Sequence, residues 1–326
     1  MVNNPIVSVV IPAYNHENYV QEAIFSVVNQ SYAAIELIVI DDGSTDTTWH
    51  KLESCRQCCE TRFLRTVFLR QNNAGRSSTL NRLIELSEGE YIYIMASDDK
   101  SHPTAIESLV SFLKKHDDYV LAVGDNELID DNGHVIYWDR KHRVVYNENE
   151  AAYKTFGAFL QHLCGFSFNA APFGEYFTFC RLNYVPNGYL VRSSVLKSHV
   201  QFTENTPLED YWMMLQVSKY GKMKYLNEVL FSYRWHQNNT VHNHTYMQQI
   251  TRQTWLQELE NVRKPGMEFF RSIFQRESSR TIMKFRIGNF LKYYKEETIS
   301  GRRKFLEIMG KKFLLKDYTH IPDETP

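Results

Sequence analysis

Two short and largely apolar runs, separated by a helical pattern, limit the possible folds more than any other feature of the chain. The runs are Ile6 to Ile11 and Ile35 to Ile40, both rich in β-branched residues. Such runs are typical of strands buried on both faces of a parallel sheet. Between them, residues 19–30 carry apolar side chains at helical spacing. The sequence therefore predicts a β-α-β unit with a right-handed connection.

The same alternation continues to residue 99 and puts polar residues where strands end. The pattern predicts a third strand at 66–69, a helix at 80–86 and a fourth strand at 91–95. Polar clusters follow three strands, at 13–15, at 41–46 and at Asp98 with Asp99. Ligands of open α/β sheets bind at the carboxyl ends of the strands. We therefore expect the three clusters to share one ligand site.

Adjacent carboxylates such as Asp98 and Asp99 repel each other, and a divalent cation is the simplest way to keep both ionised. Mg²⁺ or Mn²⁺ would suit these oxygens and would bridge the diphosphate of a nucleotide. The alternative is a helix N-cap before Pro103. Asp41 and Asp42 leave a similar choice between a contact to a nucleoside and a turn with a cap. Tyr14 could stack on a base.

Four segments taken together resemble the family 2 glycosyltransferases of GT-A fold, over the first ~100 residues and in order. They are Val7-Ser-Val-Val-Ile-Pro-Ala-Tyr-Asn15, Ile38-Val-Ile-Asp-Asp-Gly-Ser-Thr-Asp46, Asn73-Ala-Gly75, and Gly89-Glu-Tyr-Ile92 followed by Ala-Ser-Asp-Asp99. The resemblance implies an α/β GT-A fold with a mainly parallel nucleotide-binding sheet flanked by helices. It also implies a single-displacement sugar transfer with inversion, dependent on Mg²⁺ or Mn²⁺.

Carried over by position, the resemblance assigns a nucleotide site and a metal site. The nucleotide-binding residues would be Pro12, Ala13, Tyr14, Asn15, Asp41, Asp42, Asn73, Gly75, Arg76 and Asp98. Arg76 would neutralise phosphate charge. The metal motif falls on Asp98 and Asp99, but Ala96 stands where many members have a further Asp. This departure leaves open which carboxylate is the direct ligand.

Two later segments extend the resemblance. Pro207-Leu-Glu-Asp-Tyr-Trp212 resembles the family's Glu-Asp segment, which makes Asp210 the candidate catalytic base and Glu209 a residue that orients the site. The alternative is that both acids only begin a helix over 211–220, where its dipole favours them. Tyr233-Arg-Trp-His236 resembles the late histidine segment, so His236 would complete the metal shell or approach the diphosphate. His242 and His244 are close competitors.

The chain divides into three expected parts. Residues 1–125 would bind the donor, 126–245 would form the acceptor-binding and catalytic part of the same domain, and 246–326 would form a basic, mainly helical C-terminal region. Residues 126–190 show no clear period and predict an irregular, partly helical segment. Residues 251–326 hold 16 Lys and Arg against 10 Asp and Glu, interleaved with aromatics. This surface would suit anionic lipid headgroups, or it is a solvated helical face.

Composition excludes several classes. A formal charge of -1 and a pI near 6.9 give no preference for nucleic acid, and no nucleic-acid-binding module is recognisable. Neither an apolar leader nor a membrane-spanning run is visible, so we expect a cytoplasmic protein. Peripheral contact with the inner face of the membrane depends on which of the two readings of the basic C-terminal surface holds. Cys55, Cys58 and Cys59 lack the partners of a zinc site.

The expected reaction moves a sugar from a UDP-sugar to a hydroxyl of a lipid-linked saccharide in cell-surface polysaccharide synthesis. A sugar-nucleotide nucleotidyltransferase is a rival, but it needs a glycine-rich basic loop after the first strand, where this chain has Pro12-Ala-Tyr-Asn15. A carbohydrate-binding protein that has lost turnover is a second rival. Retention of Asp98, Asp99 and Asp210 argues against it.

Overall fold

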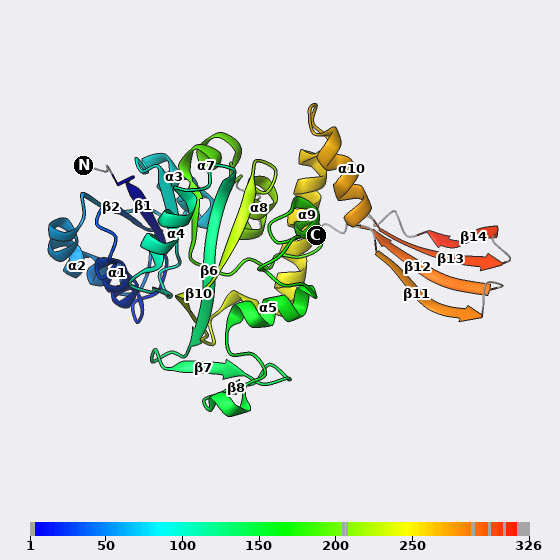
Figure 1. Ribbon diagram of the computed structural model, residues 1–326, viewed down its shortest axis with the longest axis horizontal. Coiled ribbons are helices and arrows are strands. Elements are labelled where there is room, and N and C mark those ends of the chain that lie inside the picture. Colours follow the sequence, from blue (N-terminus) through cyan, green and yellow to red (C-terminus); the bar gives the residue numbers. More distant parts are fainter. Residues whose placement is uncertain are drawn as a thin grey trace.

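The computed structural model describes residues 4–203, 206, 208–278, 280–287, 291–298, 301–308 and 311–317, and of the last four ranges only the backbone is considered. Figure 1 shows an α/β body that contains the N-terminal strands, followed by a separate small sheet beyond α10 (Glu268–Glu277).

The main sheet runs in the order β3-β2-β1-β4-β9-β6-β10-β5, with β7 and β8 added beside β6. Its strands are β1 (Val7–Ala13), β2 (Ile35–Asp41), β3 (Arg65–Arg70), β4 (Tyr91–Ile94), β5 (Lys100–Ser101), β6 (Tyr119–Ile129), β7 (Val135–Trp138), β8 (Val144–Val145), β9 (Tyr189–Arg192) and β10 (Lys222–Arg234). The first four strands pair in parallel, which confirms the predicted β-α-β unit. Consequently the carboxyl ends of β1, β2 and β4 meet at one edge.

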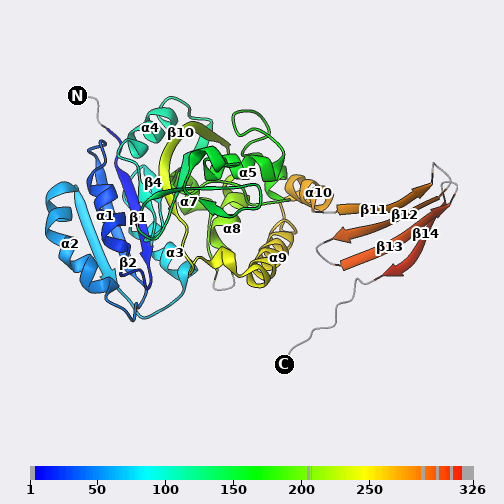
Figure 2. The same ribbon diagram turned by 90° about the horizontal axis from the view of Figure 1, so that it is seen from below.

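Helices cover both faces of this sheet (Figure 2). They are α1 (Val20–Val28), α2 (Thr48–Arg62), α3 (Arg76–Leu86), α4 (Ala105–Leu113), α5 (Phe156–Cys164), α6 (Tyr176–Phe179), α7 (Ser193–His199), α8 (Glu209–Val217), α9 (His244–Asn261) and α10, with short 3₁₀ turns at Glu148–Glu150 and Thr240–His242. Successive strand residues face opposite layers: Val9 belongs to the apolar cluster that includes residues of α1, α2 and α4, whereas Val10 belongs to the cluster that includes residues of α3, α7 and α8. This two-sided burial explains why β1 and β2 read as apolar runs.

Pro12 lies inside β1, although the apolar run of the sequence ends at Ile11. The strand continues to Ala13, paired with Asp41 of β2, while the pairing with β4 stops at Val10. Proline lacks a backbone N–H, and it is tolerated here because the ladder on one side has already ended.

Residues 126–190 are more regular than predicted. The helical part is confirmed by α5 and α6, but β7, β8 and β9 are also present. Strand β9 lies antiparallel between β4 and β6, in the middle of the sheet. Its four residues are too few to show a period, so only long-range pairing reveals it.

The prediction of a mainly helical region over 246–326 is wrong for the described residues beyond Glu277, and residues 318–326 lie outside the described part of the chain. Four antiparallel strands follow, in the order β11-β12-β13-β14. They are β11 (Arg280–Ile287), β12 (Leu291–Thr298), β13 (Gly301–Ile308) and β14 (Lys311–Asp317). Each carries aromatic or β-branched residues that favour strands, and glycines at 288, 301 and 310 separate them in the sequence. In the part of the chain that is described, no helix has the length and apolarity needed to cross a bilayer.

Candidate active site

A small cavity of about 50 Å³ lies at the carboxyl ends of β1 and β4. Its lining includes Pro12, Arg76, Ala96, Asp99, Glu209 and Asp210. These residues come from four distant parts of the sequence, and all but Ala96 are predicted site residues. The fold therefore brings the predicted donor, metal and catalytic segments to one place.

Asp98 is not among the residues that line this cavity, and it faces two histidines. Its Oδ2 lies 3.1 Å from Nε2 of His236 and 3.7 Å from Nε2 of His16. Hydrogen bonding and the nearby histidines outweigh burial and lower the pKa of the Asp98 carboxyl. The predicted pairing of Asp98 with His236 is geometrically present, while His16 was not singled out from the sequence.

Asp99 has a different environment. It is buried, and its Oδ1 accepts a hydrogen bond of 2.9 Å from the backbone N–H of Arg234. Burial and the adjacent charge of Asp98 raise its pKa well above the usual range. Helix α4 begins only at Ala105, after β5, and its N-cap is Thr104. Hence Asp98 and Asp99 do not cap a helix, and the alternative reading of this pair is wrong.

Arg234 holds the turn that carries both acids, a role that sequence reasoning missed. The side chain is completely buried, and its Nε donates to the backbone oxygen of Asp98 at 2.8 Å. Its other nitrogens reach Glu22 at 2.8 Å and the backbone oxygen of Asp130 at 2.9 Å, and the guanidinium stacks on Tyr19. A buried guanidinium with this many partners fixes the backbone around the acidic pair. In the sequence, the one sign of this role is that Arg234 stands two residues before the candidate ligand His236.

Arg76 and Glu209 form an ion pair across the cavity. Arg76 begins α3 and Glu209 begins α8, and Nε of the first lies 2.7 Å from Oε1 of the second. The charge of Glu209 raises the pKa of the guanidinium. Arg76 is 57% exposed at its side chain, so it can still reach a ligand that enters from solvent.

Asp210 is half-buried beside this pair. Its Oδ2 accepts a hydrogen bond of 3.1 Å from Nδ2 of Asn183. Burial, followed by the charge of Glu209, raises the pKa of Asp210 to about 6, although Arg76 and Asn183 oppose the rise. A carboxylate with such a pKa suits proton transfer near neutral pH. Glu209 and Asp210 also stand in the first turn of α8, which confirms the helix-start reading, while a catalytic role at the same positions stays a prediction.

Asp41 and Asn15 tie together the two turns predicted to hold a nucleoside. Asp41 is fully buried, and its Oδ1 accepts hydrogen bonds from the backbone N–H and the hydroxyl of Ser44. Its Oδ2 lies 3.1 Å from Arg70 but has no hydrogen-bond partner. Asn15 adopts a left-handed conformation (φ 52°) and accepts from the backbone N–H of Thr45. The two turns are therefore locked to one another.

Asp42 organises the Asn73–Gly75 loop. Its carboxylate accepts hydrogen bonds from the backbone N–H groups of Ala74 at 2.9 Å and Gly75 at 3.0 Å. A Cβ on Gly43 would lie 2.6 Å from the backbone nitrogen of Asn73, so only glycine permits this approach. Asp42 is thus occupied by the protein itself. Tyr14 by contrast is 45% exposed and free to stack on a base.

The remaining candidates fall outside this centre. His242 directs its Nε2 to the backbone oxygen of His236 at 3.0 Å and so supports that histidine. Cys55, Cys58 and Cys59 all lie on α2, and the described residues contain no preformed group of three His, Cys, Asp or Glu side chains able to hold a metal ion.

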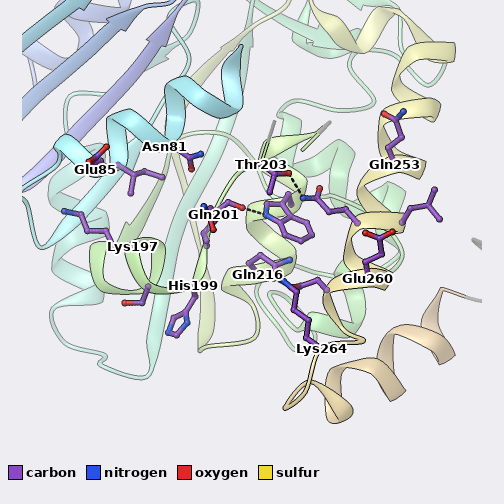
Figure 3. A pocket seen from close by; sticks show the side chains of 17 residues that line it. Asn81, Glu85, Lys197, His199, Gln201, Thr203, Gln216, Gln253, Glu260 and Lys264 are labelled. Carbon is purple, nitrogen blue, oxygen red and sulfur yellow. Dashed lines mark hydrogen bonds between the residues drawn. The ribbon is translucent and has the colours of Figure 1, made fainter. Parts of the chain in front are cut away.

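A much larger groove, of about 1380 Å³, lies between α3, α7, α8 and α9 (Figure 3). Its walls hold several side-chain amides, among them Asn81, Gln201, Gln216 and Gln257. Asn81 exchanges two hydrogen bonds with the backbone of Phe202, at 2.6 and 3.1 Å. Phe202 also lines the small cavity. The groove and the cavity therefore share the segment that leads to Glu209.

Known proteins share both sequence and fold with this chain. The chain is 32% identical over 252 residues to an uncharacterized glycosyltransferase of Haemophilus influenzae, covering 75% of this chain and 70% of that protein. Its fold matches S. aureus TarS in complex with UDP-GlcNAc, with a TM-score of 0.55 at 16% identity over 83% of this chain and 71% of that chain. It also matches the mannosyltransferase PcManGT from Pyrobaculum calidifontis in complex with GDP-Man and Mn²⁺, with a TM-score of 0.59 at 13% identity over 85% of this chain and 70% of that chain.

The two structural matches establish the fold, which is the predicted GT-A-like α/β arrangement. The family model described as "Glycosyl transferase family 2" matches residues 8–177, which is more than half of the chain. That segment contains the strand ends, the acidic pair and the nucleoside turns described above. The chain therefore belongs to glycosyl transferase family 2 and is a glycosyltransferase.

Proposed function

We propose that this glycosyltransferase moves a sugar from a UDP-sugar to a hydroxyl of a saccharide acceptor, with inversion at the anomeric carbon. The proposal rests on one observation: Arg76, Asp99 and Asp210 line the same cavity at the carboxyl ends of the strands. One charge of each required kind is available there: a cation for phosphate, and a carboxylate that can accept a proton.

The nucleoside would lie against the turns at the ends of β1 and β2. Tyr14 would stack on the base, and Asp41, whose Oδ2 has no hydrogen-bond partner, would accept from the imide of uracil. Pro12, Ala13 and Asn15 would shape this wall, and Asn73 and Gly75 would contact the nucleotide from the loop that Asp42 holds. The TarS complex with UDP-GlcNAc supports a UDP-sugar, although the PcManGT complex holds GDP-Man.

The donor diphosphate would be held near Asp98 with a divalent cation, Mn²⁺ or Mg²⁺. The donor set fits such an ion, because a carboxylate oxygen and an imidazole nitrogen already lie 3.1 Å apart at Asp98 and His236. The ring nitrogen Nδ1 of His236 is buried without a partner, so without an ion the proton lies on Nε2 and is directed at Asp98. Binding of an ion through Nε2 would move that proton to Nδ1. Asp99 is engaged by the backbone of Arg234 and would act beside the ion rather than as the first ligand. A bound ion supplies Lewis-acid stabilisation of the departing diphosphate.

Asp210 would take the proton from the acceptor hydroxyl as that oxygen attacks the anomeric carbon. Its raised pKa, about 6, makes it a sufficiently strong base at neutral pH while it remains ionised. Arg76 would contact the diphosphate, and its ion pair with Glu209 holds it at the cavity. A single displacement by one base inverts the anomeric configuration.

The acceptor would be a lipid-linked saccharide used for cell-surface polysaccharide. The excess of Lys and Arg over residues 251–326 supports contact with anionic headgroups on the inner face of a membrane, each basic residue contributing about 1 kcal/mol near the surface. Residues 126–245 would then present the acceptor hydroxyl to Asp210.

A donor panel tests the proposal. Purified protein is incubated with UDP-GlcNAc, UDP-glucose, UDP-galactose or GDP-mannose and Mn²⁺, and nucleoside diphosphate release and thermal stabilisation are measured. We expect one UDP-sugar to stabilise the protein by mass action and to release UDP, with EDTA abolishing release and Asp210→Asn reducing it. Pyrophosphate release from UTP and a sugar 1-phosphate would instead identify the nucleotidyltransferase rival, and stabilisation without any turnover would identify the carbohydrate-binding rival.

A further inference from the structure

Two imidazole rings approach the same carboxylate oxygen from different elements. Asp98 Oδ2 lies 3.1 Å from Nε2 of His236, which follows β10, and 3.7 Å from Nε2 of His16, which follows β1. The two rings are 6.3 Å apart and almost perpendicular, at 88°. Three nitrogen and oxygen donors therefore converge although their residues are far apart in sequence.

The ring of His16 is held in this direction. Its Nδ1 is hydrogen-bonded to the hydroxyl of Ser97 at 2.7 Å, and its backbone N–H donates to Thr48 Oγ1 at 2.8 Å. Tyr19 packs edge-on against it. A histidine that ligates a metal typically has its second ring nitrogen fixed by a hydrogen bond in this way, which leaves the first nitrogen directed at the ion.

The neighbouring positions of the acidic motif contrast with Asp98. Ala96 has no carboxylate, and Asp99 Oδ1 is engaged by the backbone N–H of Arg234. Ala96 and Asp99 line the cavity, whereas Asp98 and the two histidines are not among its lining residues. His16 therefore offers a further donor beside Asp98 and His236.

We infer that His16, Asp98 and His236 together form the cation site of this chain, with His16 in place of the acid that is missing at Ala96. The inference rests on the proposed function. An octahedral ion with bonds of ~2.1 Å separates adjacent donor atoms by about 3 Å. His236 and Asp98 already satisfy that spacing, and His16 needs to approach Asp98 by roughly half an ångström. Two imidazoles favour a transition ion such as Mn²⁺ over Mg²⁺.

Electron paramagnetic resonance with Mn²⁺ alone tests the assignment without using activity. Loss of the free-ion signal gives the Mn²⁺ affinity, and pulsed measurements of ¹⁴N coupling report the imidazoles bound to the ion. The variants are His16→Ala, His16→Gln and His236→Ala. The matched control is His102→Ala, because His102 is also a partly exposed histidine paired with a carboxylate, 3.0 Å from Glu127. Thermal melting in EDTA verifies that each variant folds.

We expect two coupled imidazoles in the unmodified protein and in His102→Ala, and one in His16→Ala, His16→Gln and His236→Ala. Mn²⁺ affinity should fall at least about tenfold in each of the last three, since even outer partners of a ligand contribute that much.

Two coupled imidazoles in a folded His16→Ala protein, or unchanged affinity, would overturn the inference. Sugar transfer by a protein that binds no Mn²⁺ would also overturn the inference, together with the metal requirement of the proposed function, while the transfer reaction itself stands. Mn²⁺ bound through two imidazoles in a protein that releases UDP from no donor supports the site and contradicts the proposed function.

Discussion

Arg76 Nε lies 2.7 Å from Glu209 Oε1, so an ion pair joins the first residue of α3 to the first residue of α8. The two charges act on Asp210 in opposite directions, because Glu209 raises the pKa of that carboxyl and Arg76 lowers it. The ion pair therefore sets the pH range in which the proposed base is ionised.

Neutralising each partner should move the pH profile of sugar transfer in opposite directions. In the unmodified protein, kcat/KM should rise with pH through about 6, because Asp210 accepts a proton only when ionised. Glu209→Gln should lower the midpoint and Arg76→Gln should raise it. Asp210→Asn is the reference and should lose about 10²- to 10⁴-fold in kcat. A kcat/KM that does not change across pH 6 would contradict the assignment of the base. A midpoint that moves in the same direction in both variants would contradict it as well.

Replacing Asn183 changes the pKa of Asp210 without changing a charged residue. Its Nδ2 donates to Asp210 Oδ2 at 3.1 Å and lowers the pKa of Asp210. Asn183→Ala should therefore raise the pH midpoint while leaving the high-pH plateau of kcat within a few-fold of the original. The measurement is kcat over a pH series at saturating donor. Loss of activity at every pH, with an unmoved midpoint, would show that Asn183 acts on folding rather than on the base.

Glu36 is a buried carboxylate whose contribution is to stability. It is 2% exposed and accepts hydrogen bonds from Ser8, from the backbone N–H groups of Glu88 and Gly89, and from Arg65 at 2.7 Å. Because Glu36→Ala leaves these donors without their acceptor, it should lower the free energy of unfolding by about 3 kcal/mol. Urea denaturation gives the value. Glu88→Ala is the matched control, since Glu88 is 70% exposed and pairs with the same arginine at 3.3 Å; it should cost less than about 1 kcal/mol.

The same glutamate gives a pH dependence with a defined sign. Burial raises the pKa of Glu36, but the hydrogen bonds from Ser8, Glu88, Arg65 and Gly89 outweigh it, and the folded pKa is lowered. Its stabilisation is thus complete above the unfolded pKa of about 4.3 and is lost as pH falls through the folded value. The stability difference between the unmodified protein and Glu36→Ala should therefore shrink below about pH 4. A difference that stays constant from pH 7 to pH 3 would rule out this role.

Local patterns were sufficient for the N-terminal half of the fold. Strands β1 and β2 are buried on both faces, so their apolar runs are visible without knowledge of their partners. Asp98 and Asp99 follow a strand directly, and their position at the sheet edge follows from that. The long-range features were not visible. Arg234 reaches Asp99 across 135 positions, and β9 enters the sheet between two strands that precede it in sequence.

The C-terminal error has a different cause. Charged and aromatic residues in β11 to β14 fit a helical face or a strand face almost equally well, and their pairing partners lie in the neighbouring hairpins. His16 was missed because a single histidine in a loop belongs to no repeating sequence pattern. The role inferred for it depends on contacts with Ser97 and Asp98, which the fold brings to it from the end of β4.

The amide-lined groove should influence catalysis through the segment it shares with the cavity. Asn81 of α3 holds the backbone of Phe202, and Trp212 Nε1 of α8 donates to the backbone oxygen of Gln201 at 3.1 Å, so the start of this stretch is anchored to two helices that flank the site. Asn81→Ala removes two hydrogen bonds and should shift the start of α8 slightly. Since misplacement of a reacting group by about 1 Å can cost 10²-fold in rate, we expect a fall in kcat of at least about tenfold with little change in donor affinity.

Glu85→Ala, which changes an exposed residue of the same groove, is the control and should leave both constants unaltered. Steady-state kinetics with Mn²⁺ and the preferred donor measure the two constants. An unchanged kcat in Asn81→Ala would mean that the segment keeps Asp210 in place without this anchor.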